Sequence, residues 1–337
     1  MAKPWTTDPN YTLFFQAGQG GEAIHPSAPA FAGGAGAFVQ AGSQGAFSNG
    51  LAGFPHPLSP ANLQITPELV RKAAAAPATP FGVKDIPKVM TGKLNWPKSA
   101  ALMQRWLDEP KLKMTKRQKE GDDLADTYPK TGLELKLFTM EWLLKYPRAG
   151  DALDVLKQRL DTPAALSQLK KLMASQPLVG KASFLIKNAA DPVALHAHWQ
   201  FQRSPLVESS MRAMDDLSGA LGRFMFYAAV LAGEVTGSPS LLRVRKVGLY
   251  MRDTYDFLGG QYLGHWNEQG MGLPVAAAVA SAAELEWSLP AYSVNHGWMT
   301  PINNSDFDAY RDKTGQGNDL LVFSDVLPFD TLIEVPL

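Results

Sequence analysis

The pattern of hydrophobic and polar positions divides the chain into three regions. Residues 1–65 are rich in Gly, Ala, Pro and Ser and show no sustained apolar period. Residues 66–180 contain segments with the apolar spacing of helices, whereas residues 181–337 contain segments that alternate or are continuously apolar, as strands are. We therefore predict an α+β protein in which a helical N-terminal half is followed by a mostly antiparallel β domain.

In the second region, proline and capping residues predict where helices begin. Proline fits the first position of a helix and stands at Pro67, Pro97 and Pro163, and Asp161 precedes the last of these as a capping residue. The charged segment 111–130 predicts an exposed loop, and the segment after it, LELKLFTMEWLLK, fits either a helix or a strand. Helices are predicted at 67–76, from Pro97, at 151–160 and from Pro163.

Strands dominate the third region. Residues 223–232 form an apolar run that fits a central strand, and residues 242–250 alternate between two faces. An Ala-rich helix is expected at 275–285, and a second helix is expected after the polar cluster 303–306. The remaining strands are predicted at 183–187, 196–201, 320–323 and 331–335.

Charge and cysteine content narrow the function classes. Lys plus Arg and Asp plus Glu are 32 each, so the net charge is zero and does not favour nucleic-acid binding. The absence of cysteine excludes disulfides, thiol nucleophiles and cysteine-ligated zinc. No apolar run is long enough to span a bilayer, and the first ten residues lack the apolar core of a secretory signal. We expect synthesis in the cytoplasm and, if the protein is secreted, a route without a cleaved signal peptide.

The densest group of reactive side chains lies in residues 247–266, VGLYMRDTYDFLGGQYLGHW. On a strand, Asp253 and Tyr255 share a face and Asp256 points away, unless a turn from Phe257 brings Asp256 round again. Two carboxylates three residues apart are suited to one Mg²⁺, which prefers oxygen ligands. A different interpretation makes both carboxylates turn formers ahead of the glycine pair, with Tyr255 in the core.

Two resemblances give this group a context. The phrases WPKSAALMQRWL, TMEWLLKYPRA, VGLYMRDTYDFLGGQYLGHWN and NNSDFDAYRDKTGQGNDLLVFSDV resemble an uncharacterised bacterial family that is often encoded near type VI secretion and polymorphic-toxin genes. The resemblance covers about residues 85–330 and brings no assigned activity with it.

The second resemblance is narrower. The stretch Asp253-Thr-Tyr255-Asp256 is similar to the D-x-Y-D motif of colicin M-like toxins, which cut the peptidoglycan precursor lipid II at its pyrophosphate and need a divalent metal. The resemblance implies catalytic roles for Asp253, Tyr255 and Asp256, with Mg²⁺ held by the two carboxylates. These toxins follow their motif with a His-Arg pair, whereas here His265 comes later and precedes a tryptophan. The arginine must therefore come from elsewhere, with Arg252 and Arg311 as candidates.

Other polar groups have a structural interpretation beside a functional one. His196 and His198 share a face on a strand, which suits zinc, although no third ligand is evident. His296 is a second candidate for the active-site histidine. The cluster 303–306 fits a helix cap, or a helix start that offers amide groups and Arg311 to a phosphate. No G-x-S-x-G motif is present, which argues against a serine lipase.

Together these observations predict an antibacterial secreted effector that hydrolyses lipid II or a related polyprenyl pyrophosphate in the periplasm of a target cell during interbacterial competition. Its expected partners are the lipid substrate, a type VI secretion carrier that binds the N-terminal segment 1–65, and a cognate immunity protein. Two alternatives remain open. The first is a non-enzymatic adaptor or immunity-type protein of a secretion locus, and the second is a phospholipase or other membrane-directed hydrolase.

Overall fold

The structure is a computed structural model that describes residues 81–120, 130–174, 183–208, 214–237, 240–259, 261–272, 291–293 and 297–337. The predictions for the N-terminal segment, for the helix at 67–76, for the helix at 275–285 and for His296 lie outside these residues. The α+β class is confirmed, whereas a helical N-terminal half as a whole is not established, because the first 80 residues are not described.

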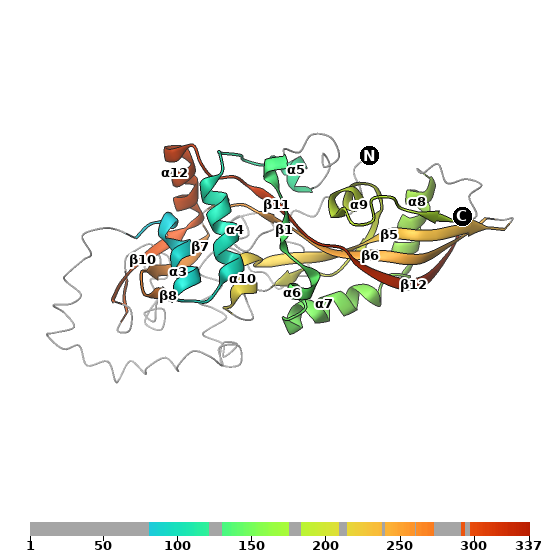
Figure 1. The fold of residues 1–337 in the computed structure, drawn as a ribbon, viewed down its shortest axis with the longest axis horizontal. Coiled ribbons are helices and arrows are strands. Elements are labelled where there is room, and N and C mark those ends of the chain that lie inside the picture. Colours follow the sequence, from blue (N-terminus) through green and yellow to red (C-terminus); the bar gives the residue numbers. More distant parts are fainter. Residues whose placement is uncertain are drawn as a thin grey trace, which may run out of the picture.

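The helices and strands follow one another along the chain as shown in Figure 1. The α-helices are α3 (Ile86–Gly92), α4 (Pro97–Asp108), α5 (Lys116–Glu120), α6 (Met140–Leu143), α7 (Pro147–Lys157), α8 (Pro163–Ala174), α9 (Pro192–His198), α10 (Asp216–Ala220) and α12 (Asn304–Thr314). Two short 3-10 helices are η2 (Val83–Asp85) and η3 (Lys130–Gly132). The strands are β1 (Leu133–Phe138), β2 (Phe184–Leu185), β3 (Gln200–Arg203), β4 (Val207–Glu208), β5 (Arg223–Thr236), β6 (Leu241–Tyr255), β7 (Tyr262–Asn267), β8 (Gly270–Gly272), β9 (Ala291–Ser293), β10 (Gly297–Asn303), β11 (Leu320–Ser324) and β12 (Leu327–Pro336).

The long antiparallel hairpin of β5 and β6 is the centre of an eight-stranded sheet. The outer edge of β5 pairs with β4, β3 and β2 in turn, and the outer edge of β6 pairs first with β11 and then with β12. The strand β1 extends the sheet beyond β11 as its parallel member. The other described pairings between named strands are antiparallel, as the sequence predicts. A second sheet has the strand order β8-β7-β10-β9.

Helices cover both faces of the central hairpin, which explains why β5 and the second half of β6 are almost continuously buried. On one face, Phe226, Ala228 and Val230 belong to the main core together with residues of α4, α7, α8 and α10. On the other face, Tyr227 and Ala229 form a smaller cluster with residues of α9 and β11. Successive residues of β5 therefore face the main core and the smaller cluster in turn. Because both faces of the strand are buried, its sequence is continuously apolar.

The predicted boundary near residue 180 does not separate two cores. The strand β1 lies before this boundary and pairs with β11 near the end of the chain. The helices α4, α7 and α8 also lie before it, and they contribute to the same hydrophobic cluster as β5, β6 and β12. Residues on both sides of the boundary therefore build one folded body.

Several local predictions are confirmed and others need correction. The helices from Pro97 and Pro163 and the strands at 223–232, 242–250 and 320–323 are present. The segment LELKLFTMEWLLK is a strand followed by a short helix, so both readings of it hold in part. The segment 111–130 is not wholly a loop, since it contains α5. The stretch 196–201 is not a strand, because α9 runs to His198 before β3 begins.

The N-terminus of α4 is held by a residue from a distant helix. The carboxylate of Asp216 accepts hydrogen bonds from the backbone N–H groups of Lys98 at 3.1 Å and Ser99 at 2.8 Å, and from the Ser99 hydroxyl at 2.9 Å. The two helices approach so closely that a Cβ atom on Gly219 would lie 2.5 Å from Ser99 Oγ. This contact fixes α4, which carries Trp106 toward the end of β6.

Candidate functional site at the end of strand β6

The predicted motif lies where β6 ends beside the start of β11. In the antiparallel register, Tyr255 is opposite Leu320 and Asp253 is opposite Val322. The next residues outward are Asp256, after the end of β6, and Asp319, before the start of β11. The register therefore brings Asp256 and Asp319, which are distant in the sequence, to the same end of the sheet. The two carboxylates lie close enough for their negative charges to interact.

Six buried charged residues gather at this place, and we refer to them as the charged cluster. They come from α5, from the end of β6, from α12 and from the residue before β11. Each is at most 8 % exposed, although charged side chains are seldom buried this fully unless they are paired. The members are Lys119, Arg252, Asp253, Asp256, Arg311 and Asp319.

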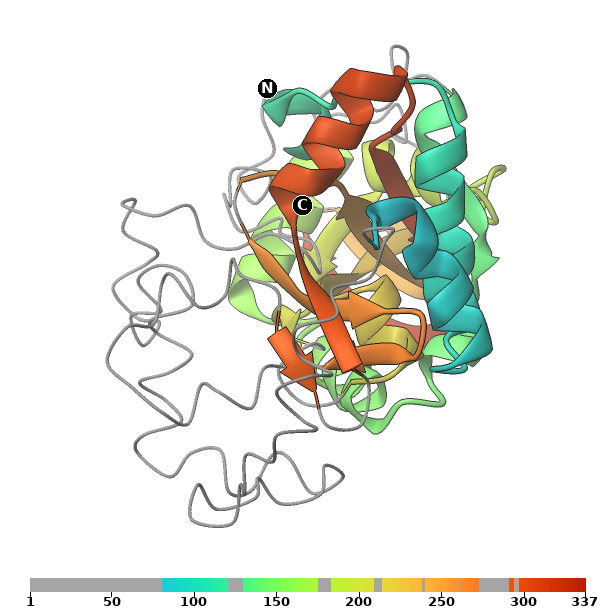
Figure 2. The ribbon, with the colours of Figure 1, turned by 90° about the vertical axis from the view of Figure 1, so that its left-hand side faces the viewer.

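Two ion pairs organise the charged cluster. The ammonium group of Lys119 binds the Asp256 carboxylate, and the backbone carbonyl of Lys119 accepts a hydrogen bond from Arg252 Nη2. Arg311 Nη2 donates to Asp319 Oδ1, and the guanidinium lies 4.9 Å from the ring centroid of Trp106. Figure 2 views the molecule from this end, with α12 in red and the strands of the small sheet in orange.

The two carboxylates of the D-x-Y-D motif lie on different sides of the sheet, as strand alternation predicts. Asp253 is opposite Val322, a residue of the main core, and Tyr255 packs against Phe257 in that core with ring centroids 5.2 Å apart. Asp256 instead contacts Lys119, the residue that also binds Arg252. The turn after Tyr255 does not bring Asp256 back to the side of Asp253.

Burial dominates the electrostatics of both carboxylates. It raises the pKa of Asp253 well above its usual value, although the N–H of Thr254 and the charge of Arg252 act in the opposite direction. Asp253 Oδ1 accepts from the Thr254 N–H at 2.8 Å, and Oδ2 has no hydrogen-bond partner among the residues that the structure describes. Burial also raises the pKa of Asp256 against the pull of Lys119, and the neighbouring charge of Asp319 adds to that rise.

The structure places His265 in a different sheet from the rest of the predicted site. It lies on β7 and is fully buried, and its Nδ1 atom is within hydrogen-bond distance of the Tyr262 hydroxyl. Burial raises the pKa of Tyr262. The structure therefore places Arg252, Asp256 and Arg311 on one side of the end of β6 and Asp253 on the other side. The hydrogen bond described for His265 is with a residue of its own strand.

The described geometry does not fit one Mg²⁺ held jointly by Asp253 and Asp256. The two carboxylates face different sides, and an ammonium group already occupies the cation position at Asp256. Within the described ranges, no group of three or more His, Cys, Asp or Glu side chains is arranged to hold a metal ion. A magnesium site formed by these two residues remains a prediction.

The histidine pair at 196 and 198 is not a pair on one face. Both residues lie on α9, where residues two apart point in different directions. His196 is buried and its Nδ1 atom is 3.1 Å from the Tyr250 hydroxyl, whereas His198 is exposed. The shared-face geometry that would suit zinc is therefore absent.

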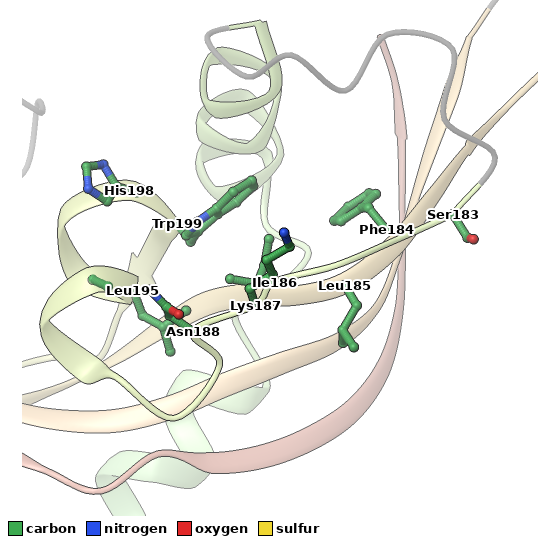
Figure 3. Close-up of a pocket in the computed structure, with 10 residues that line it drawn as sticks. Ser183, Phe184, Leu185, Ile186, Lys187, Asn188, Leu195, His198 and Trp199 are labelled. Atoms are coloured by element: carbon green, nitrogen blue, oxygen red, sulfur yellow. The ribbon is translucent and has the colours of Figure 1, made fainter.

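A hollow of about 480 Å³ lies elsewhere, between β2 and α9. Phe184 of β2 and Trp199 at the end of α9 lie on either side of it, as Figure 3 shows. Lys187 and His198 add polar groups to its wall. None of the residues that line it belongs to the charged cluster, so the hollow does not give access to the predicted catalytic residues.

Two members of the charged cluster were missed by reasoning from the sequence. Lys119 sits in a run of charged residues that resembles an ordinary solvent-exposed stretch. Asp319 carries a weak signal, because it is a charged residue directly before an apolar strand. Its carboxylate also accepts from the Met114 N–H at 3.0 Å and lies 3.5 Å from Trp106 Nε1.

A comparison with protein families decides the relationship of this chain. The model of a family of unknown function, DUF6402, matches residues 81–335. The chain belongs to the DUF6402 family. The DUF6402 region includes every member of the charged cluster, from Lys119 to Asp319. Searches of curated proteins and of solved structures found no match. No helix in the described part of the DUF6402 region is long and apolar enough to cross a membrane.

Proposed function

We propose that this DUF6402 protein is an antibacterial effector that hydrolyses the pyrophosphate linkage of lipid II or a related polyprenyl pyrophosphate. The observation that supports it is the charged cluster at the end of the D-x-Y-D strand. Three cations and three carboxylates are buried there, and the pKa values of Asp253 and Asp256 are raised. Perturbed ionisable groups gathered in one place are typical of functional sites, although structural ion-pair networks also produce them.

The residues divide into roles that the reaction needs. Arg252 and Arg311 neutralise the phosphoryl oxygens, because planar guanidinium groups match phosphate geometry. Asp253 is the general acid, since burial raises its pKa well above the usual value and so favours the protonated form, which can give its proton to the departing phosphate oxygen.

His265 lies in the other sheet with its Nδ1 atom at the Tyr262 hydroxyl, so the described contacts assign no residue as the base that takes the proton from the attacking water. Tyr255 shares a face of β6 with Asp253 and packs against Phe257. Water adds to one phosphorus as the bridging P–O bond breaks.

A reaction with purified lipid II tests this assignment. The wild-type chain, incubated with lipid II and Mg²⁺, is expected to release the polyprenyl and headgroup products, and Asp253→Ala is expected to lose that activity. Asp330→Ala, which changes an exposed residue of β12, serves as the matched control and should behave as wild type. Equal product from Asp253→Ala and wild type, or no product from either, would reject the assignment.

Burial of the six predicted residues favours a second candidate, a non-enzymatic adaptor or immunity-type protein of a secretion locus. Arg252, Asp253, Tyr255, Asp256, His265 and Arg311 are each at most 4 % exposed. In this candidate the charged cluster only holds α5, β6 and α12 together. Directed expression separates the two candidates, because an effector stops growth when exported to the periplasm and not when kept in the cytoplasm. An adaptor has neither effect.

The remaining parts of the proposal concern delivery and related substrates. A secretion carrier binds the N-terminal segment, and a cognate immunity protein neutralises the exported effector in the producing cell. Co-purification of the chain with secretion-spike proteins, with and without residues 1–65, tests the first partner. Product analysis on phospholipid vesicles tests whether the substrate is a phospholipid instead, since a membrane-directed hydrolase would release fatty acids or headgroups.

A further inference from the structure

The hollow between β2 and α9 follows the outer edge of the central sheet. Six consecutive residues, 183–188, line one wall of it, and they include the whole of β2. The end of α9 lines the other wall with Leu195, His198 and Trp199. The volume of about 480 Å³ lies within the range of about 300–1,000 Å³ that is typical of ligand sites. The hollow is therefore large enough to receive part of another molecule.

The main chain of β2 leaves one residue open toward the hollow. In the antiparallel register of β2 and β5, the Ile186 N–H donates to the Leu231 carbonyl at 2.8 Å. Residues of an antiparallel strand bond across to the partner strand alternately, so the N–H and C=O groups of Leu185 point away from β5. The strand β2 ends the described strand order β1-β11-β6-β5-β2. Leu185 therefore offers one donor and one acceptor at the wall of the hollow.

The side chains of the wall combine apolar surface with positive charge. The rings of Phe184 and Trp199 lie on either side of the hollow (Figure 3), and both are half-buried. Lys187 and His198 are exposed, and the described lining contains no Asp or Glu. The net charge of the whole chain is zero, so this excess of basic side chains is local. The wall thus suits a ligand with apolar parts and negative charge.

An extended peptide fits these features better than a lipid does. Any ligand that fills the hollow covers the main chain of Leu185, and a covered donor or acceptor without a partner lowers the affinity. A peptide strand supplies both a carbonyl and an N–H to that residue, whereas an acyl chain supplies neither. Peptide side chains on either side of the paired residue fall on the face of Phe184, because side chains alternate along a strand.

We propose that the hollow is a docking site for an extended, acidic segment of a partner protein. The segment pairs with Leu185 as an added strand and places apolar side chains between Phe184 and Trp199. Its carboxylates pair with Lys187 and His198. The lining shares no residue with the charged cluster, so the inference is independent of the proposed hydrolysis.

Binding of short peptides to the wild-type full chain tests the proposal without any variant. The probe is a labelled Glu-Leu-Thr-Leu-Glu peptide, blocked at both ends, in which the two leucines share one face of a strand. Fluorescence anisotropy is expected to show saturable binding. Affinity is expected to fall about tenfold or more when lysine replaces both glutamates, or when the central residue is N-methylated. Equal binding of all three peptides, or no saturable binding of the acidic one, would overturn the proposal.

Leu185→Pro and Leu185→Ala form a matched pair that tests the main-chain pairing. Proline removes the outward N–H, which makes no bond to β5, whereas alanine keeps that N–H and shortens the side chain. Leu185→Pro is expected to bind the acidic peptide about tenfold more weakly or worse, and Leu185→Ala is expected to stay within about threefold of wild type. Urea unfolding checks that both variants fold. An equal loss of affinity in the two folded variants would contradict the pairing.

A charge reversal tests the electrostatic part. Lys187→Glu is expected to weaken binding of the acidic peptide about tenfold and to strengthen binding of its lysine counterpart. Lys88→Glu reverses the charge of an exposed residue on α3, which does not line the hollow, and should change neither affinity. The same response in both variants would show that the peptide does not bind at the hollow.

Other occupants of the hollow give different results. Saturable binding of laurate, with none of any peptide, would reject the peptide site in favour of a lipid site. A dimer that light scattering detects, and that Leu185→Pro abolishes, would replace the partner protein with a second copy of this chain. A monomeric chain that binds the acidic peptide and not laurate supports the proposal.

Discussion

Replacing Asp253 with asparagine is expected to stabilise the folded protein at neutral pH. Asparagine has the shape of the carboxylic acid and keeps the oxygen that accepts from the Thr254 N–H. It removes a buried group whose ionised form is disfavoured by burial. A residue retained for structure alone would show the opposite result, because its replacement would cost stability.

The size of the effect follows from proton linkage. Burial raises the pKa of Asp253 above 3.8, so the folded state holds the proton over a pH range in which the unfolded state has released it. Folding is therefore penalised as pH rises above that value, by at most about 1.4 kcal/mol per pH unit, until pH reaches the folded pKa. Between pH 5 and pH 7 the advantage of Asp253→Asn over wild type is expected to grow by up to about 2.7 kcal/mol.

Urea unfolding of both proteins at pH 5, 6, 7 and 8 measures this advantage. Asp215→Asn provides a control with the opposite electrostatics. Burial acts to raise the pKa of Asp215, but hydrogen bonds from Arg148 and Ser218 lower it below its usual value, so its titration lies below pH 3.8. The effect of Asp215→Asn should therefore be constant over this pH range. A pH-independent difference for Asp253→Asn, or a loss of stability at pH 7, would refute the reasoning.

Three further changes test the packing that positions the site, each by urea unfolding. Asp216→Ala leaves the amide donors at the start of α4 without their acceptor and is expected to cost about 1–3 kcal/mol; rescue by Asp216→Asn would support the hydrogen-bond explanation. Gly219→Ala forces a methyl group against α4 and is expected to cost about 1–3 kcal/mol. Gly150→Ala, in a helix where the added methyl meets nothing within 4 Å, should instead gain about 0.5–1 kcal/mol. Tyr250→Phe leaves the buried His196 without its phenol partner and is expected to cost about 1–2 kcal/mol; no loss would show that this hydrogen bond contributes little.

The sequence was most informative where a single strand decides the geometry. The alternation of residues 242–250 predicts β6, and its continuation correctly separates Asp253 and Tyr255 from Asp256. Period-two geometry needs no knowledge of distant residues, which is why this part of the candidate site could be predicted.

The other parts depend on contacts between distant segments or on the helix cap at Asp191. The pairing of Asp256 with Lys119 joins residues far apart in the chain, and nothing near Lys119 marks it as buried. The helix α9 has a local signal, since Asp191 accepts from the N–H groups of residues 193 and 194 and is followed directly by proline, a pattern typical of a helix start. The predicted strand at 196–201 is therefore wrong, because this cap favours a helix through His196 and His198.

The order in which the central hairpin acquires its neighbours has a consequence for synthesis. The described strands that pair with the outer edge of β5 precede it in the chain, whereas the two described strands that pair with the outer edge of β6 follow it at a distance. During translation one edge of the hairpin can pair with strands at once, whereas the N–H and C=O groups of the other edge bond to water until β11 and β12 leave the ribosome. A protein that binds extended chains has that interval in which to pair with the open edge of β6.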